Sequence, residues 1–380
     1  MKKVCILINA MAGGGAERAI AQVAQQIDPN KYALHFVFLE DIQAYSIDPK
    51  IPQTILCKGK RSLLWMPMAL WRFGRWLKQH QPDIILSSLT RAHLLSILSK
   101  VAYPQGKRII SEQTDTYAAY ASRPVFSALL KYLFSFADGA HFVSKGIEWS
   151  WRTHGHFKQP SQVIFNSIDL SHILEASQED LPQDAHEFFN SKVIVHAGRL
   201  VPQKNQMLLL EAFALLPEDY RLAILGEGPL EKSLRDKAEA LGLGERVRFF
   251  GFQENPYAYF TRSEFMVLSS DFEGFGNVLI EAMACGLPVV STDCPSGPRE
   301  VLAPETPFSE HLQPGQGNEL AEYGVLVPMA DAQGLAQAMK SLSEDKALQQ
   351  NYGQKSKERA NDFVLDKISR EYEVLLAGLV

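Results

Sequence analysis

Two carboxylates eight positions apart, Glu273 and Glu281, are the side chains whose type and spacing most clearly suggest chemistry in this chain. Phe275, Gly276 and Asn277 stand between them, where a loop is predicted to enter a helix. A helix N-terminus has free N–H groups and a positive partial charge, so it suits an anionic ligand. One acid on the loop and one on the helix could hold two parts of an extended molecule that carries phosphate. The same spacing also arises when one acid caps a helix and the other faces solvent.

Two cations stand at a second candidate position for phosphate binding. Arg199 and Lys204 follow an apolar run, Val193–His196, that is predicted to be a strand, and Gly198 opens the turn that leads to them. Lys204 comes just before the next predicted helix. Two fixed cations and the N–H groups of a helix would together bind a diphosphate well. Taken alone, this segment could equally carry two solvated surface cations.

Glycine-containing turns follow two other predicted strands. Gly226 lies in a turn that lacks the third glycine of a dinucleotide-binding loop, so it indicates either a tight turn or a close approach to a nucleoside. Gly14 and Gly15 end a run of three glycines after the first strand, with no Lys–Ser/Thr of a P-loop behind them. They would let the backbone approach a ligand closely, and a merely flexible turn is the alternative.

Short apolar runs alternate with helical patterns in both halves of the chain, which predicts two parallel sheets covered by helices. The expected fold class is α/β, with two doubly wound, Rossmann-like domains facing across a cleft. Ligands of such sheets bind at the carboxyl ends of the strands, so the cleft is the expected active site. Strands are expected at Val4–Ile8, Leu34–Leu39, Asp83–Ser87, Arg108–Ser111, Gly139–Phe142, Gln162–Ile164, Val193–His196, Arg221–Leu225, Val247–Phe250, Phe265–Leu268 and Pro288–Ser291.

The length of 380 residues suits two domains of roughly 150–200 residues each. We place the first domain at 1–170 and the second at 191–361. A polar, acidic segment at 171–190 is expected to link them, and an amphipathic helix at 362–380 is expected to follow the second domain. Nothing in the sequence indicates an oligomeric state.

Charge is distributed unevenly along the chain. Residues 1–170 carry 20 Lys and Arg against 11 Asp and Glu, whereas residues 171–380 carry 18 against 32, within a net charge of −5. The basic first half favours an anionic partner such as lipid headgroups or a phosphorylated substrate, and no nucleic-acid-binding motif is present. The four cysteines lack metal-ligand spacing, and the first apolar run is too short for a secretory signal. These features favour the cytoplasm.

Two aromatic segments of the first half suggest contact with a membrane or an acceptor. Lys58–Lys78 carries six cations, no acid and three tryptophans, which is typical of a helix on a membrane surface. An ordinary helix that packs its aromatic face on the sheet is the alternative. Tyr117–Phe136 carries Arg123 and Lys131 and could line an acceptor channel. The side chains expected to contact the membrane are Trp65, Trp71, Trp76, Arg72 and Arg75.

Three motifs together resemble a known enzyme family. They are Gly-Gly-Ala-Glu-Arg after the first strand, Gly-Arg-Leu-x-x-x-Lys-Asn at the start of the second domain, and Glu-Gly-Phe-Gly-Asn-x-x-x-Glu-Ala-x-Ala-x-Gly-x-Pro-Val-Val. Their order and spacing resemble the GT4 family of retaining glycosyltransferases, which have the GT-B architecture, over nearly the whole chain. The resemblance implies a first domain that binds the acceptor, a second that binds a nucleotide sugar, and a last helix that packs back on the first domain.

The resemblance also implies roles for single residues. Arg199 and Lys204 match the family's diphosphate clamp, Glu281 the acid that holds the ribose, and Glu273 the acid that faces the donor sugar. Glu273, Arg199 and Lys204 are thus the expected catalytic residues. The other matched donor-binding positions are Gly14, Gly15, Gly198, Gly226, Phe275, Gly276 and Asn277.

The sequence departs from the family on the acceptor side. Many relatives carry a His, or a Ser-Glu-His/Arg-Asn stretch, where this chain reads Ser-Glu-Gln-Thr-Asp from Ser111. Glu112 fits this pattern, but Gln113 replaces the imidazole or the cation. His93 could supply an imidazole instead, although a His at a helix start is more often a capping or surface residue. Glu112, Gln113 and His93 are therefore the acceptor-side candidates.

The resemblance implies transfer of one sugar, with its configuration retained, from a nucleotide donor. We expect a UDP-linked hexose or N-acetylhexosamine as donor and a lipid-linked or surface-glycan acceptor at the inner face of the membrane. No Asp-x-Asp occurs, so neither a metal site nor another cofactor is expected. The alternatives are a GDP-mannose-using transferase of the same fold, a nucleotide-sugar epimerase and a binding protein without activity.

Overall fold

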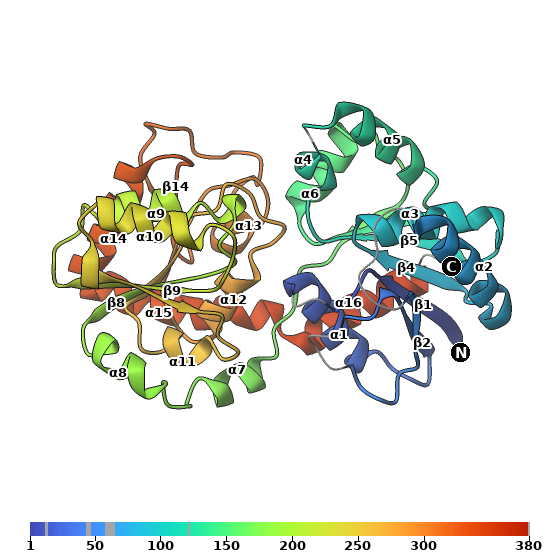
Figure 1. Cartoon of the computed structure of the whole chain (residues 1–380), viewed down its shortest axis with the longest axis horizontal. Helices are drawn as coiled ribbons and strands as arrows, with labels where there is room; N and C mark the ends of the chain where they lie inside the picture. Colours follow the sequence, from blue (N-terminus) through green and yellow to red (C-terminus); the bar gives the residue numbers. More distant parts are fainter. Residues whose placement is uncertain (12–13, 43–46, 58–64, 121, 379–380) are drawn as a thin grey trace. The chain divides into compact units, whose positions relative to one another are not determined.

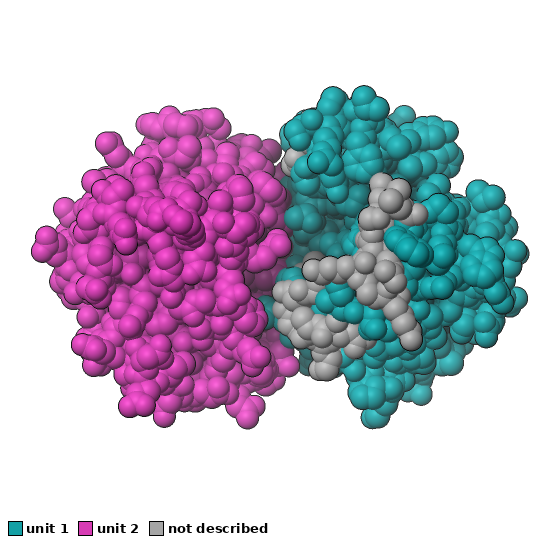
Figure 2. Space-filling model, in the orientation of Figure 1, with its two compact units in different colours: residues 1–167, 365–380 teal, residues 168–364 magenta. Residues whose placement is uncertain are grey.

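The computed structural model describes residues 1–11, 14–42, 47–57, 65–120 and 122–378. The chain divides into two compact units, each with its own sheet (Figures 1 and 2). Unit 1 comprises Met1–Ser167 and Leu365–Val380, and unit 2 comprises Ile168–Val364. The chain therefore leaves unit 1 once and returns to it for the last helix.

The described strands of unit 1 form a seven-stranded parallel sheet in the order β3-β2-β1-β4-β5-β6-β7. Strand β1 is an apolar run because both faces of the sheet are covered. Alternate residues of β1 enter different cores: Ile6 joins the cluster under one layer of helices, and Leu7 joins the opposite cluster. The strands are β1 Lys2–Ile8, β2 Tyr32–Glu40, β3 Gln53–Cys57, β4 Ile84–Ser88, β5 Lys107–Glu112, β6 Gly139–Phe142 and β7 Ser161–Val163.

Helices cover both faces of this sheet. One core includes side chains of α1 and α16, and the other includes side chains of α2 and α3. The last helix, α16, packs on α1, so the end of the chain is an integral part of unit 1. The helices are α1 Gly15–Gln26, α2 Met66–His80, α3 Thr90–Leu98, η2 Ser99–Val101, α4 Thr116–Ala119, α5 Pro124–Phe134, α6 Lys145–Thr153 and α16 Leu365–Gly378.

Unit 2 repeats the arrangement with the strand order β10-β9-β8-β11-β12-β14-β13, and only β13 runs antiparallel to its neighbour among the described strands. The strands are β8 Lys192–Ala197, β9 Tyr220–Leu225, β10 Val247–Gly251, β11 Phe265–Leu268, β12 Val289–Thr292, β13 Glu319–Leu320 and β14 Val325–Val327. The helices are α7 Leu170–Ala176, α8 Gln183–Phe189, η3 Pro202–Lys204, α9 Gln206–Phe213, α10 Glu231–Ala240, η4 Gly244–Arg246, α11 Tyr257–Phe260, α12 Asn277–Ala284, α13 Pro298–Leu302, α14 Ala332–Glu344, α15 Lys346–Ala360 and η5 Asn361–Phe363.

The segment 171–190, which we expected to be a linker, lies within unit 2 and carries helices α7 and α8. Asp169 caps α7 by accepting a hydrogen bond from the His172 N–H. Ile173 and Phe188 are buried, so apolar side chains of both helices attach this polar segment to the unit. The last helix begins at Leu365 rather than at 362, after the short turn η5.

Candidate active site

The order of strands reverses in both units, which marks the edge where such sheets bind ligands. In unit 2 the reversal lies between β8 and β11, and in unit 1 between β1 and β4. The predicted donor-site residues of unit 2 follow the carboxyl ends of β8, β9 and β11, so they share one edge of this sheet. The predicted acceptor-side residues follow β4 and β5 in unit 1.

The centre of the unit 2 edge is an ion pair between Lys204 and Glu273. Nζ of Lys204 lies 2.5 Å from Oε1 of Glu273, and the two side chains are only 15% and 6% exposed. The same carboxylate oxygen accepts a hydrogen bond of 2.6 Å from the Ser270 hydroxyl. The structure thus brings together two of the three predicted catalytic residues, although the chain separates them by 69 positions.

Arg199, the third of these residues, is exposed after β8, and its guanidinium forms no ion pair with any described acid. Gly198, just before it, donates its N–H to the Leu225 carbonyl at 2.9 Å. Gly226 has φ +131°, and a Cβ there would lie 2.1 Å from the Gly198 carbonyl oxygen. Only glycine fits at position 226, where the turn after β9 approaches the turn after β8. The close approach that Gly226 makes is to protein backbone, and its contact with a nucleoside stays a prediction.

The turn that carries Lys204 is tied to the loop that carries Glu273. The Ser269 hydroxyl donates to the Lys204 carbonyl at 2.9 Å, and the Asp271 N–H donates to the Gln203 carbonyl at 2.9 Å. The side-chain amide of Asn205 donates to Asp271 at 2.8 Å. These bonds fix the distance between cation and acid independently of the ion pair itself.

Helix α12 begins beside this ion pair, as the sequence predicted. Gly276 caps it with φ +86°, a conformation that favours glycine, and Asn277 is its first residue. Phe275 is 2% exposed and packs its ring against Phe363 at 5.4 Å. Glu281 lies on the second turn of α12 and is 6% exposed. The side chain of Glu281 therefore does not face solvent. This excludes the alternative in which one acid caps the helix and the other is solvated.

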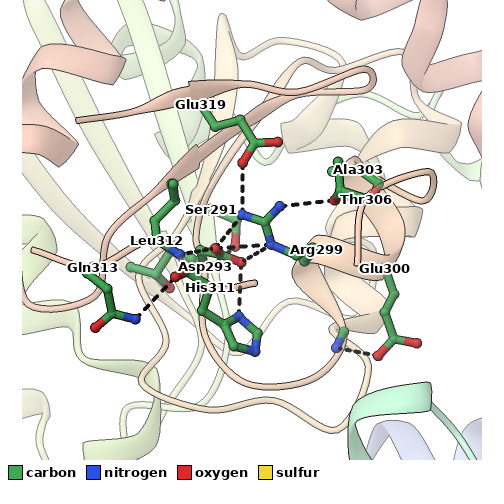
Figure 3. A network of polar contacts seen from close by, with 12 residues as sticks. Ser291, Asp293, Arg299, Glu300, Ala303, Thr306, His311, Leu312, Gln313 and Glu319 are labelled. Atoms are coloured by element: carbon green, nitrogen blue, oxygen red, sulfur yellow. Dashed lines mark hydrogen bonds and ion pairs between the residues drawn. The ribbon is translucent and has the colours of Figure 1, made fainter. Parts of the chain in front are cut away.

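A network of charged side chains lies just after strand β12 (Figure 3). Arg299 lies between Asp293 and Glu319, with Nη2 at 2.6 Å and 2.8 Å from their carboxylates. The Asp293 carboxylate also accepts hydrogen bonds from His311 at 3.3 Å and from the Leu312 N–H at 2.7 Å. Burial alone would raise the pKa of Asp293, but these bonds and the charge of Arg299 hold it below its ordinary value.

This network anchors the start of α13, which touches the loop that carries Glu273. The Ser296 hydroxyl donates to the Glu273 carbonyl at 2.5 Å. A Cβ on Gly297 would lie 2.3 Å from the Phe275 carbonyl, so the two backbones meet there. Sequence reasoning missed Ser296 and Asp293 as supports. Their position just after β12, at the ligand-binding edge, was the available signal.

His196 lies beneath the same edge. It is fully buried, its Nδ1 donates to the Val267 carbonyl at 2.9 Å, and its Nε2 accepts from the Gln206 amide at 3.2 Å. Burial, with a smaller effect of the charge of Lys204, lowers the pKa of His196 to about 4, so the ring is neutral near pH 7. The site therefore keeps its positive charge on Lys204 and Arg199.

The three acceptor-side candidates line one pocket of about 260 Å³ in unit 1. Glu112 Oε1 accepts hydrogen bonds from the N–H and the hydroxyl of Thr116. Its Oε2 lies 3.3 Å from Nε2 of His93, and both side chains are nearly inaccessible. His93 is fully buried between Glu112 of β5 and Ser87 of β4, so the alternative that it is a capping or surface residue is wrong. The other lining residues are Asn9, Leu89, Thr90, Arg91, Gln113, Thr114 and Tyr120.

The hydrogen bonds of Ser87 orient the His93 ring. The Ser87 hydroxyl donates to the Ile109 carbonyl at 3.2 Å, so its oxygen accepts from Nδ1–H of His93 at 3.0 Å. Nε2 of His93 then faces Oε2 of Glu112, and neither atom has a hydrogen-bond partner among the described residues.

A second relay orients Gln113 on the same pocket. Nε2–H of His141 donates to the Ile164 carbonyl at 2.8 Å, so Nδ1 accepts from the Ser111 hydroxyl at 2.8 Å. Burial lowers the pKa of His141 to about 4, which keeps this ring neutral. The Ser111 oxygen can then accept from the Gln113 amide at 3.3 Å. Oε1 of Gln113 is buried and finds no donor in the described part of the chain, so it remains as an acceptor for a ligand.

The remaining predicted residues lie elsewhere in unit 1. Gly14 caps α1 and Gly15 is its first residue. Residues 58–64 of the basic segment fall outside the described residues. Trp65 and Trp71 are 40% and 60% exposed, but the prediction that Trp76 contacts a membrane is wrong, because its ring is buried and stacks on His80 at 4.3 Å.

The two arginines of α2 also make contacts within unit 1. Arg72 donates to the Leu56 carbonyl, and Arg75 lies over the Trp71 ring at 5.0 Å. In the described chain, no helix combines the length and apolar character needed to cross a membrane. Nor do the described His, Cys, Asp and Glu side chains gather in a group of three that could hold a metal ion. The expectation of metal-free chemistry stays a prediction.

Family comparisons agree with the two units. Residues 177–359 match the family described as Glycosyl transferases group 1, and residues 13–172 match Glycosyltransferase Family 4. A protein of Campylobacter jejuni subsp. jejuni serotype O:2 is 30% identical to this chain over 389 residues, covering 100% of both. It is N-acetylgalactosamine-N,N'-diacetylbacillosaminyl-diphospho-undecaprenol 4-alpha-N-acetylgalactosaminyltransferase. The chain belongs to glycosyltransferase family 4 and is a glycosyltransferase.

Further relatives and solved structures extend the comparison. The lipopolysaccharide 1,6-galactosyltransferase of Salmonella typhimurium is 25% identical over 319 residues, covering 80% of this chain and 83% of that protein. The crystal structure of Anabaena HepE in complex with UDP and glucose matches with a TM-score of 0.80 at 20% identity, covering 100% of both chains. Sucrose-phosphate synthase from Thermosynechococcus elongatus matches with a TM-score of 0.82 at 18% identity, covering 100% and 99%. The architecture is GT-B, as predicted.

Proposed function

We propose that this glycosyltransferase moves one hexose or N-acetylhexosamine from a UDP-sugar to a lipid-linked or surface-glycan acceptor, with retention of configuration. The observation that carries the proposal is the unit 2 edge, where Lys204, Glu273 and the start of α12 meet in one rigid arrangement. A UDP donor is supported by the HepE structure, which contains UDP, and the acceptor by the undecaprenol-linked and lipopolysaccharide substrates in the relatives' names.

The chemistry follows from the charges that develop when a sugar–phosphate bond breaks. Positive charge builds on the sugar ring, and negative charge builds on the departing diphosphate. Lys204, Arg199 and the free N–H groups at the start of α12 would stabilise the diphosphate. Glu273 would face the sugar, and Glu281, buried on the second turn of α12, would accept hydrogen bonds from the ribose hydroxyls.

Retention requires the acceptor to attack the face that the diphosphate leaves. The departing phosphate would then take the proton of the acceptor hydroxyl, so the protein needs to hold the two reactants rather than supply a base. Gln113 and Glu112 of unit 1 present oxygens that would accept hydrogen bonds from sugar hydroxyls. In this proposal the leaving group is stabilised by protein cations, without a metal or another cofactor.

A lipid-linked acceptor would bring the enzyme to the inner face of the cell membrane as a peripheral protein. The excess of Lys and Arg over Asp and Glu in residues 1–170, 20 against 11, favours attraction to anionic headgroups. The exposed rings of Trp65 and Trp71 lie in the same part of the chain.

Thermal unfolding in the presence of UDP, GDP, ADP, CMP and a panel of UDP-sugars tests the donor. A ligand at about 100 times its Kd stabilises the native state by about 2.7 kcal/mol. This corresponds to several degrees, on the order of 5 °C, in a protein of this size. We expect a shift with UDP and one UDP-sugar that is lost in Lys204→Ala. A shift with GDP and GDP-mannose instead would overturn the UDP assignment.

Radiolabelled transfer tests the reaction itself. With the donor that shifts unfolding, we expect label to move to a membrane lipid extract from cells that make the acceptor. The product should keep the anomeric configuration of the donor when its new bond is examined by NMR. Conversion of the donor without any acceptor would favour an epimerase, and an inverted product would refute the retaining mechanism.

A further inference from the structure

Helix α5 carries a row of apolar side chains that face solvent. Val125 is 85% exposed, Leu129 50%, Tyr132 64%, and Phe136, two residues beyond the helix, 48%. Their spacing of four, three and four residues places them on one face, and the opposite face of α5 is buried in unit 1. We call these four residues the α5 stripe. A contiguous apolar surface of this kind marks a site of interaction.

The apolar surface continues onto the turn η2. The ammonium group of Lys100 donates to the Phe136 carbonyl at 2.8 Å, which holds η2 beside the end of α5. On either side of Lys100 in the sequence, Val101 is 94% exposed and Leu98 is 36% exposed. The surface therefore spans two segments that the chain separates by more than twenty residues, so it is a feature of the folded unit.

Within the sequence from 116 to 137, which contains the α5 stripe, every charged residue is a cation. No acid occurs between Asp115 and Asp138, whereas Arg123 and Lys131 lie within that range. Arg123 is exposed at the start of α5. Asp138, the next acid, lies 2.9 Å from the ammonium group of Lys100 and is thereby neutralised. An apolar face bordered by cations is complementary to a lipid bilayer that contains anionic headgroups.

Among the described residues, the α5 stripe carries four exposed large apolar side chains, whereas the segment of α2 carries three, Trp65, Met68 and Trp71. On α2, which the sequence favoured, Trp76 is buried, and of its three tryptophan rings only those of Trp65 and Trp71 remain exposed. On α5, the Tyr132 and Phe136 rings pack edge to face at 5.2 Å. Aromatic side chains in this arrangement suit the depth of the headgroups, where one part is apolar and another is wet.

The start of α5 adjoins the unit 1 pocket. Tyr120 lines the pocket, and its ring contacts the ring of Phe126 on α5 at 5.0 Å. A ligand with a sugar at one end and a lipid at the other could therefore place the sugar in the pocket while its lipid remains in the bilayer beside α5.

We propose that the α5 stripe, extended by Val101, is the surface with which this glycosyltransferase docks on an anionic lipid bilayer. The inference rests on the proposed function, because it gives the lipid-linked acceptor a place to stay in the membrane while its sugar end reaches the pocket. The docked partner is the lipid surface itself, and a second copy of the chain or another protein would be a different occupant.

Vesicle sedimentation of the full-length protein tests this proposal. The probes are vesicles of phosphatidylglycerol and phosphatidylethanolamine, with vesicles of phosphatidylcholine for comparison. Leu129→Glu combined with Tyr132→Glu places two acids on the stripe, and because both positions are exposed the fold should persist, as unchanged thermal unfolding would show. We expect its partition coefficient on anionic vesicles to fall by about tenfold or more. Leu215→Glu in unit 2, 60% exposed, is a control that should change it little, and Trp71→Glu on α2, also 60% exposed, measures the contribution of the alternative surface.

Each other outcome overturns the α5 assignment. Unchanged binding by the double variant, or a larger loss with Trp71→Glu, would move the surface to α2. A native protein that ignores all vesicles would remove the docking surface altogether. A native dimer that the double variant converts to a monomer would make a second copy the occupant. In each of these cases, a shift of unfolding by UDP that depends on Lys204 would leave the proposed function standing.

Discussion

Replacement of Lys204 by Met is the sharpest test of the unit 2 site, because it removes one charge and retains most of the side-chain length. In the native protein, the ammonium group lies 2.5 Å from Oε1 of Glu273, and the acid is 6% exposed. In the variant, Glu273 keeps the hydrogen bond from the Ser270 hydroxyl but loses its cation. The substitution therefore acts on stability and, under the proposed function, on the leaving diphosphate.

The two effects have different magnitudes. Removal of one partner from a fully buried ion pair costs about 3–5 kcal/mol. Lys204 is 15% exposed, so water will reach the remaining carboxylate in part, and we expect a loss of about 2–3 kcal/mol in the free energy of unfolding. This lowers Tm by roughly 5–10 °C. The loss of a group that stabilises developing charge lowers the transfer rate by about 10²–10³.

A double-mutant cycle separates structure from catalysis. Lys204→Met combined with Glu273→Gln leaves no unpaired charge, so thermal unfolding should recover most of the lost stability while the initial rate of sugar transfer stays low. Lys192→Met is the matched control, because its pair with Asp219 is equally short at 2.6 Å but about half exposed. Because water screens this pair, the substitution should change Tm little and leave the rate unchanged. Recovery of the rate in the double variant would show that Lys204 acts only as a structural partner.

Three further predictions concern the supports of the site. Gly226→Ala should lower the free energy of unfolding by about 3 kcal/mol or more, because its Cβ would meet the Gly198 carbonyl. Gly242→Ala, where a Cβ would have nothing within 4 Å, should cost only about 1 kcal/mol. Equal losses of stability in urea unfolding would show that the close approach of Gly226 to Gly198 does not require glycine. The native pKa of His196, about 4, lies below its ordinary 6.5, so the unfolded chain binds more protons between these values, and stability should be full above pH 6.5 and decline towards pH 4. His196→Gln should make that decline shallower in thermal unfolding across pH, and an unchanged slope would contradict the assignment. Arg299→Met should lower the free energy of unfolding by about 3–5 kcal/mol, because Asp293 and Glu319 lose their cation (Figure 3). It should also raise the Kd for UDP, as calorimetry would measure. A stable variant with native UDP affinity would show that this network does not hold the loop that carries Glu273.

The sequence was sufficient for the elements with strong periodic patterns. Each predicted strand corresponds to a strand of the structure. The strands that were not predicted, β3, β13 and β14, have two to five residues and lie at or next to an edge of their sheets. Their positions are set by pairing with longer neighbours rather than by their own composition.

The site was predictable where it depends on local motifs and obscure where it depends on distant partners. Glu273 and Lys204 could be singled out from the ends of two strands, although their contact required the fold. The burial of His93 on α3 could not be predicted, because its partner Glu112 lies 19 positions away on strand β5. Trp76 shows the converse: its basic neighbours suggested a surface helix, but the helical phase directs its ring into the core.

The pairing of Lys204 with Glu273 has a consequence for the order of events under the proposed function. In the structure, the positive charge of Lys204 is balanced by Glu273. A diphosphate bound at the same edge would share this cation, and its own negative charge would weaken the attraction between Lys204 and the acid. Glu273 would then be free to interact with the sugar, whose ring becomes positive as the bond breaks. Arg199, exposed at the same edge, could meet the diphosphate first, because it has no ion pair to a described acid to give up. Donor binding would thus prepare the acid for the charge that develops next to it.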